Sequence, residues 1–272
     1  AFCKRADQTL PGMLIDSHNH LADPRFDGKR DRIIEEMKSA GIVHCVVNGT
    51  GPTDWPIVAD LAEKHPAFIT PSFGLHPWRI HDFPDDWLSS LAEYLQRFPR
   101  AGLGECGLDR WMTEPDFSSQ IEVFEKQLAL AAKLNRPTTI HCLKAWGPLL
   151  DCLRSLPTLP PILIHSFGGS LETGRELAKL GAYFSFSGVF LDKRKAKQLD
   201  IFTLLPADRL LLETDAPDML PPADYQKYPF EGLNHPANLQ KISRAFFNHT
   251  QITIDQHIRR SVKFFKIDDF SR

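Results

Sequence analysis

Short apolar runs alternate along the chain with longer amphipathic segments, and this alternation limits the possible folds more than any other feature. The apolar runs, which we expect to form strands, cover residues 13–16, 42–47, 68–75, 101–105, 138–141, 161–165, 182–187 and 210–214. The amphipathic segments, which we expect to form helices, cover residues 29–40, 54–65, 85–98, 116–135, 145–156, 170–181, 193–205, 236–248 and 254–265.

Eight expected strands that are nearly all separated by helices, within roughly 250 residues, predict a single (β/α)8 TIM-like barrel. The apolar runs are continuous rather than alternating, which is typical of parallel strands buried on both faces. A doubly wound open sheet is the structural alternative. No Gly-x-Gly-x-x-Gly pattern follows the first strand, which weakens the dinucleotide-binding form of that alternative.

Composition excludes several classes of protein. The chain has 272 residues and a formal net charge of -2, so a polyanionic substrate would have to be held by a local basic patch or by bound cations. Five scattered cysteines without a Cys-x-x-Cys pair argue for a reducing compartment, and we expect a cytoplasmic protein. No apolar run approaches the roughly 18 residues of a membrane span. The sequence predicts no membrane association and no obligate protein partner.

The first twelve residues differ from the rest of the chain. Residues 1–12 are partly charged, precede Met13, and lack the apolar segment of a signal peptide. We expect them to be a disordered extension or a remnant of expression. Residues 13–272 are expected to form the barrel.

Side chains that can bind metal ions follow several of the expected strands. In such a barrel the carboxyl ends of the strands meet at one face, where active sites lie. His18 and His20 follow the first strand, and in an extended backbone residues i and i+2 point to the same side, so both imidazoles could face one ion. The other candidates at later strand ends are Glu105, His141, His165 and Asp215.

Each candidate also has an ordinary interpretation, as a loop residue in water or as a core histidine with a polar partner. Together, four imidazoles and two carboxylates make a mixed set of ligands that suits Zn, Mn, Mg or Fe. Six ligands exceed the three protein ligands of a catalytic site with one zinc ion. Two divalent ions that share a carboxylate would account for the excess. Such ions, about 3.5–4 Å apart, can stabilise the attacking and leaving oxygens of a phosphoryl displacement.

The stretches that carry these residues resemble the TatD-type metal-dependent deoxyribonucleases, a branch of the amidohydrolase-like barrels. The matching stretches are residues 15–21, 74–77, 104–109, 140–142, 165–170 and 211–217. The motifs after the fourth and eighth strands are specific, whereas His-x-His is shared with many related hydrolases. The resemblance implies a TIM-like barrel, a divalent metal site and hydrolysis of phosphodiester bonds in DNA.

The resemblance also implies a role for each metal-binding candidate. The family's ligand positions correspond here to His18, His20, Glu105, His141, His165 and Asp215. The first two histidines would share one ion with Asp215, the last two would bind the other ion, and Glu105 would bridge the pair. Asp215 and Glu105 would be catalytic, because Asp215 would accept a proton from a water activated by the two ions.

The expected substrate contacts rest on weaker signals. His76 matches a family position that contacts a substrate phosphate, and Arg110 lies just past the fourth strand. Lys144 stands where the family has an arginine, and it could supply a point charge without bidentate geometry. Asp109 could orient a ligand histidine. Trp111 could be either a stacking face for an unpaired base or a packing residue.

The leading hypothesis is a deoxyribonuclease that acts on DNA ends or on single-stranded DNA. Two alternatives stay open: hydrolysis of a lactone, amide or phosphotriester in the same barrel, and a catalytically idle metal-binding scaffold. The chain has Asn234-His235-Pro236 where the family often has Asn-Glu-Pro. This difference, together with Lys144, leaves the substrate open.

Overall fold

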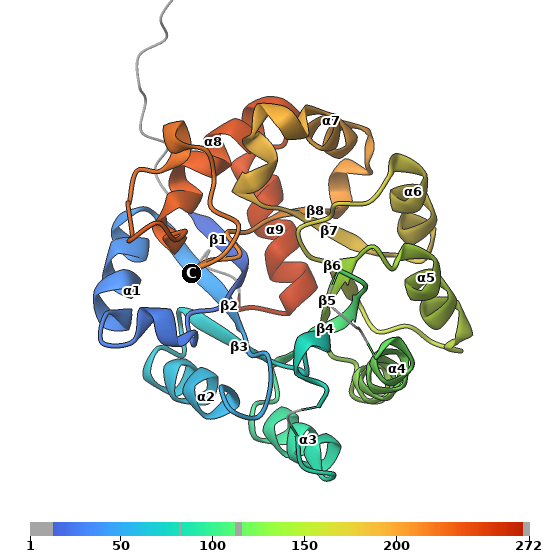
Figure 1. The fold of residues 1–272 in the computed structure, drawn as a ribbon. Coiled ribbons are helices and arrows are strands. Elements are labelled where there is room, and N and C mark those ends of the chain that lie inside the picture. The colour runs from blue at the N-terminus through green and yellow to red at the C-terminus, as the bar shows by residue number, and fades with distance from the viewer. Residues whose placement is uncertain (1–12, 82, 112–115, 269–272) are drawn as a thin grey trace, which may run out of the picture.

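The computed structural model describes residues 13–81, 83–111 and 116–268; the expected extension at residues 1–12 lies outside them. Eight parallel strands form one sheet in sequence order (Figure 1). They are β1 (Leu14–Asn19), β2 (Ile42–Asn48), β3 (Ile69–Phe73), β4 (Gly102–Asp109), β5 (Thr138–Leu143), β6 (Ile162–Ile164), β7 (Tyr183–Phe186) and β8 (Leu210–Leu212). The predicted (β/α)8 barrel is confirmed.

Helices follow the strands, and all of the described helices except α9 surround the ring of strands on the outside (Figure 1). They are α1 (Arg30–Ser39), α2 (Trp55–Lys64), α3 (Trp87–Arg97), α4 (Phe117–Leu134), α5 (Trp146–Ser155), α6 (Leu171–Lys179), α7 (Ala196–Leu204), α8 (Leu239–Thr250) and α9 (Ile254–Phe265). Ser170 caps α6 by accepting a hydrogen bond from Thr173 N, because its hydroxyl replaces a missing helical acceptor. None of the described helices has the length and apolar character needed to cross a bilayer.

The ring closes at the seam between β8 and β1. Asp215 N donates a hydrogen bond of 3.0 Å to His18 O. The buried Asp16 carboxylate accepts hydrogen bonds from Thr214 N at 2.9 Å and from Thr214 Oγ1 at 2.6 Å. A side chain of β1 therefore binds the segment after β8, and this fixes the segment that carries Asp215 against the one that carries His18.

Helix α9 differs from the others because it crosses the middle of the ring in Figure 1. Its Phe264 and Phe265 pack against Val46, Leu163 and Leu211 inside the barrel. Just past α9, the ammonium group of Lys266 donates a hydrogen bond to a backbone carbonyl in the turn ahead of β5. Helix α9 therefore covers the amino-terminal end of the barrel, and the carboxyl ends of the strands are left for a site.

The observed strand ranges differ from the predicted ones by a few residues at their ends, and β3 and β4 are two examples. Strand β3 is shorter than the predicted 68–75, and it runs through Pro71, which is paired with Val47 of β2. Strand β4 continues past residue 105 to Asp109, because it pairs with β5 over this length. Gly107 makes that pairing possible: its φ is +146°, and a Cβ there would lie 1.9 Å from His141 O.

Candidate metal centre

All six predicted metal ligands lie together at the carboxyl ends of the strands, with Glu105 at the centre. Glu105 Oε2 is 3.4 Å from His18 Nε2 and 3.0 Å from His20 Nε2. Glu105 Oε1 is 3.1 Å from His141 Nδ1 and 2.9 Å from His165 Nε2. The two oxygens of one buried carboxylate therefore face two different pairs of imidazoles.

Asp215 completes the group around Glu105 Oε2. Its Oδ1 lies 3.2 Å from His18 Nε2 and 3.4 Å from His20 Nε2, and these two nitrogens are 3.1 Å apart. The His18 ring stacks on the ring of His165, with centroids 4.2 Å apart. The residues around Glu105 Oε2 therefore contact the residues around Glu105 Oε1, and together they form one compact cluster.

The hydrogen bonds of two histidines show that the cluster suits a cation. His20 Nδ1 lies 2.9 Å from Asn48 O, and a carbonyl oxygen only accepts hydrogen bonds, so Nδ1 carries the proton. His141 Nε2 likewise faces Asp109 Oδ2 at 2.9 Å. In their neutral forms both rings then direct a lone pair toward the Glu105 carboxylate. Lone pairs that face one another require a proton or a metal ion between them.

The protonation of the cluster follows from its charges. Burial alone would raise the pKa of Glu105, but the charge of His165 and a hydrogen bond from His141 outweigh it, so the pKa lies well below its ordinary value. Burial would lower the pKa of His165, but Glu105 holds that pKa well above its ordinary value. The pKa values of His20 and His141 are raised as well, because hydrogen bonds to neighbouring carboxylates outweigh burial. Without metal, protons would sit on these three histidines, so metal binding should release protons.

A set of neighbouring groups fixes the ligand side chains. Asp109, expected to orient a histidine, accepts hydrogen bonds from Trp78 Nε1 at 2.7 Å and from Trp111 N at 2.6 Å besides facing His141. The Gln120 side chain holds the backbone of Asp109: its Oε1 accepts a hydrogen bond from Asp109 N, and its Nε2 donates one to Asp109 O. Such partners set the tautomer and orientation of a ligand ring.

Glu213 plays a similar part beside His165. Its carboxylate is fully buried, accepts hydrogen bonds from Ser166 N at 2.7 Å and Ser166 Oγ at 2.6 Å, and lies 3.6 Å from His165 Nδ1. The backbone nearby is strained, because Ser166 has a φ of +40° and Asp215 a φ of +55°. Strain of this kind concentrates where a fold must hold a side chain in a functional position.

A cavity of about 390 Å³ opens over the cluster. Its charged lining residues are Asp23, Arg25, Arg79, Glu105, Asp215 and Asp218. When the histidines are neutral, as metal ligands are, four carboxylates and two arginines give the lining a net charge of -2 before any ion is counted. Bound divalent cations would reverse this sign.

The three expected substrate contacts lie in different places. His76 lines the cavity, but Trp78 N donates to its Nδ1, so its Nε2–H points to Glu105 Oε1 at 3.3 Å. Burial lowers the pKa of His76 to about 4, so the ring is neutral. The Arg110 guanidinium lies 4.0 Å from the Phe117 ring centroid. Among the described residues, neither Arg110 nor Lys144 lines the cavity.

Trp78 and Trp111 place exposed aromatic rings at this end of the barrel. The Trp111 ring is 64% exposed and carries Lys144 Nζ at 3.9 Å from the ring centroid. Trp78 is 60% exposed and lines the cavity directly. The sequence interpretation considered Trp111 but missed Trp78.

Sequence reasoning also missed Arg25, Arg79 and Glu213. Arg79 lies three residues after His76, and Glu213 lies two residues before Asp215, so proximity to the motifs could have indicated both. Arg25 gave no such signal, because its bidentate pairing with Asp218 at 2.9 and 2.7 Å joins residues 193 positions apart.

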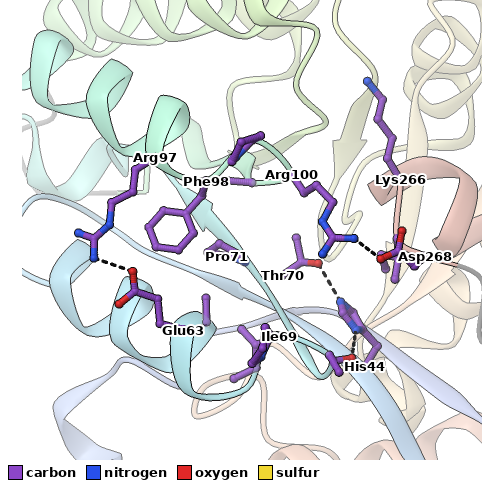
Figure 2. Close-up of a pocket in the computed structure, with 16 residues that line it drawn as sticks. His44, Glu63, Ile69, Thr70, Pro71, Arg97, Phe98, Arg100, Lys266 and Asp268 are labelled. Atoms are coloured by element: carbon purple, nitrogen blue, oxygen red, sulfur yellow. Dashed lines mark hydrogen bonds and ion pairs between the residues drawn. The ribbon is translucent and has the colours of Figure 1, made fainter.

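A second cavity of about 640 Å³ lies near the amino-terminal end of the barrel (Figure 2). Its two arginines are paired with carboxylates: Arg97 with Glu63 at 2.6 Å, and Arg100 with Asp268. Its lysine, Lys266, donates to the backbone carbonyl of Asn135. The buried His44 on its floor faces Thr70 Oγ1 at 2.8 Å. This cavity is larger, but it contains none of the six predicted ligands, so the metal centre lies in the smaller one.

The fold and the cluster define a barrel hydrolase with a metal-binding site at the carboxyl ends of its strands. Comparison with known proteins is more specific. The family described as TatD related DNase matches residues 15–266. The chain is 33% identical to the 3'-5' ssDNA/RNA exonuclease TatD of Erwinia billingiae over 84% of its length and 88% of the relative. The TatD exonuclease of Edwardsiella piscicida is 32% identical over 85% and 89%.

A solved structure gives the same result. The crystal structure of YjjV, a TatD homologue from Escherichia coli K12, superposes with a TM-score of 0.82 at 28% identity, covering 92% of this chain and 95% of that one. The chain therefore belongs to the TatD family. The prediction of a TatD-type metal-dependent hydrolase is confirmed.

Proposed function

We propose that the protein hydrolyses phosphodiester bonds in single-stranded DNA or at DNA ends, with two divalent ions held on either side of Glu105. The observation that carries this proposal is the division of the Glu105 carboxylate, whose two oxygens face separate pairs of histidine nitrogens at 2.9–3.4 Å. A carboxylate that faces two sets of ligands suits a pair of ions better than a single ion.

The ligands fall into two groups in this proposal. His18, His20 and Asp215 hold one ion, and His141 and His165 hold the other. When bound, the ions supply positive charge that stabilises the attacking and leaving oxygens of the phosphate. The side chains of the protein orient the substrate and move the proton.

Asp215 accepts the proton of the attacking water. Burial would raise the pKa of Asp215, but hydrogen bonds from His18 and His20 outweigh it, so the pKa lies well below its ordinary value and the carboxylate is ionised at neutral pH. Asp215 also lines the cavity, where a substrate could reach it. An ionised carboxylate that faces the cavity is suited to act as a general base.

The names of relatives and the cavity rim both support a single-stranded substrate. The curated relatives are named 3'-5' ssDNA/RNA exonucleases, and we extend that substrate class and polarity to this chain. Trp78 offers an exposed ring at the rim on which an unpaired base could stack. Arg79, also in the lining, could bind a backbone phosphate.

The identity of the ions and the location of the protein are part of the same proposal. Imidazole and carboxylate ligands admit Zn, Mn, Mg or Fe, and availability selects among them. A cytoplasmic location is supported by the described cysteines, which are the free thiols Cys45, Cys106, Cys142 and Cys152.

The proposal is tested with a single-stranded oligonucleotide labelled at either end. Protein stripped with EDTA should be inactive, and added Mn²⁺ should restore activity. With a 3′ label, a 3′-to-5′ exonuclease releases labelled mononucleotide first; with a 5′ label, it produces a ladder of shortened strands. The matching RNA strand should be cut at a rate similar to that of the DNA strand. A blunt DNA duplex should be cut more slowly than the single strand.

The remaining outcomes distinguish the alternatives. Turnover of lactones or phosphotriesters with no action on DNA would show that the barrel hydrolyses a different bond. Metal binding without turnover of any of these substrates would identify an idle scaffold. Activity that persists after complete metal removal, verified by elemental analysis, would contradict a metal-dependent mechanism.

A further inference from the structure

A cluster of basic side chains lies at the end of the barrel opposite the metal centre. It surrounds a cavity of about 370 Å³ between the start of β7, the turn before β8, and α9. The lining residues are Tyr183, Asp208, Arg209, Arg259, Arg260 and Lys263. Four cations therefore share the cavity with one carboxylate, although the whole chain carries a net charge of -2.

The charges of this cluster are poorly balanced. Arg260 Nη1 is buried and has no hydrogen-bond partner among the described residues. Within the same described part of the chain, no carboxylate lies within 4 Å of Arg259, Arg260 or Lys263. Asp208 approaches only Arg209, at 3.8 Å, and its side chain is 78% exposed. A buried N–H of a charged group without an acceptor is costly, so an anion would stabilise this arrangement.

One member of the cluster, Arg209, is held in place. Arg209 Nη1 donates a hydrogen bond of 2.7 Å to Gly181 O, and the guanidinium lies 5.1 Å from the Tyr183 ring centroid. Arg259 and Lys263 are four residues apart on α9 and therefore lie on one face of the helix. A ligand would meet one cation that is already oriented and two that project from a single helix face, so it would lose less free energy in ordering Arg209.

The cavity of Figure 2 lies at the same end of the barrel and provides a contrast. There Arg97 and Arg100 are each paired with a carboxylate. The two arginines of the Figure 2 cavity have carboxylate partners, whereas Arg259 and Arg260 have none within 4 Å among the described residues. The basic cluster on α9 is therefore a candidate for an external anion.

We propose that the basic cluster binds a phosphate group at a site separate from the metal centre. A phosphate has several acceptor oxygens and up to two negative charges, which matches several guanidinium and ammonium donors around one cavity. The volume of about 370 Å³ exceeds that of one phosphate, so the phosphate could belong to a larger molecule such as a nucleotide. This proposal does not depend on the proposed nuclease activity.

The test is a calorimetric titration of inorganic phosphate into protein stripped with EDTA, so that metal ions cannot bind the probe. The variants are Arg260→Met, which retains an apolar stem, and Lys263→Gln, which is exposed. Each should weaken phosphate binding by about tenfold or more, since one charge-assisted hydrogen bond contributes about 1.5–3 kcal/mol. Arg97→Met, which removes a paired arginine at the same end, is the control and should bind like the wild type.

The outcomes are distinct. Absence of phosphate binding, or equal weakening in Arg97→Met and the cluster variants, would overturn the proposal. If Arg260→Met does not fold, as judged by circular dichroism, Lys263→Gln alone decides.

Repeating the titration with a 5′-mononucleotide and with vesicles that contain phosphatidic acid identifies the source of the phosphate. Hydrolytic activity should be unchanged in Lys263→Gln, which separates this site from the metal centre.

Discussion

Asp215 shows how a single residue can combine structural and chemical roles. Its backbone N–H joins β8 to β1 by donating to His18 O, and its carboxylate faces the nitrogens of His18 and His20. The residue adopts a φ of +55° to do both. In the proposed mechanism it is a metal ligand and the proton acceptor, so its charge matters more than its shape.

Replacement of Asp215 by asparagine tests this role, because the amide retains the shape but cannot accept the proton. We expect kcat for hydrolysis of the oligonucleotide to fall by at least about 100-fold, the usual contribution of a positioned general base. Circular dichroism should show an unchanged fold. Asp60→Asn, on the exposed face of α2, is the control and should retain full activity; similar rates for both variants would refute the assigned role.

At the residue scale, the ligand positions could be predicted from the sequence and the cavity rim could not. His18 and His20 were predictable because the two-residue period of a strand fixes their side, and the structure brings their Nε2 atoms to 3.1 Å from each other. Arg25 was not predictable, because its place depends on Asp218 in a distant loop. Arg110 was expected at the substrate, but it lies against Phe117.

At the scale of elements, the pairing of β4 with β5 places both Glu105 and His141. Gly107 lies opposite His141 in this pairing, and it is the residue that lets the two backbones approach. The motif around Gly107 could be recognised from sequence, but the length of β4 could not. Its extension to Asp109 depends on β5, which begins 29 residues later at Thr138.

Gly107→Ala should therefore disrupt the metal centre through the backbone. The new Cβ would lie 1.9 Å from His141 O, and the positive φ is strained for alanine, so we expect a loss of more than about 1 kcal/mol in the free energy of unfolding. Gly147→Ala, in α5 with nothing within 4 Å of its Cβ, is the control and should be neutral or stabilising. Urea denaturation measures both, and equal stability of the two variants would contradict this account.

At the scale of the whole molecule, α9 links the far end of the barrel to the strand that carries the first histidines. His257 of α9 is fully buried, and its Nε2 lies 3.1 Å from Ile15 O and 3.3 Å from Ile15 N in β1. Burial lowers the pKa of His257 to about 4. The sequence predicted α9 as a helix, but its place across the barrel depends on contacts with residues more than 200 positions away.

This histidine gives the fold a predictable dependence on pH. Between its ordinary pKa of about 6.5 and its folded value, the unfolded chain binds a proton that the folded chain does not, so acidification lowers stability. In EDTA-treated protein, the free energy of unfolding should fall between pH 8 and pH 5 for both the wild type and His257→Gln. The fall should be about 2 kcal/mol smaller for His257→Gln, because it lacks the titrating imidazole. Burial also lowers the pKa values of His44 and His76 to about 4, but these residues titrate in both proteins and their effects cancel. Parallel stability curves would show that His257 does not titrate as described.

The central claim, two cations on either side of Glu105, is tested most directly by a crystal grown with Mn²⁺. Anomalous scattering at the manganese edge should show two peaks about 3.5–4 Å apart. One peak should lie among His18, His20 and Asp215, and the other beside His141 and His165. A single peak would contradict the paired arrangement, and an absence of peaks within this cluster would contradict the metal centre itself.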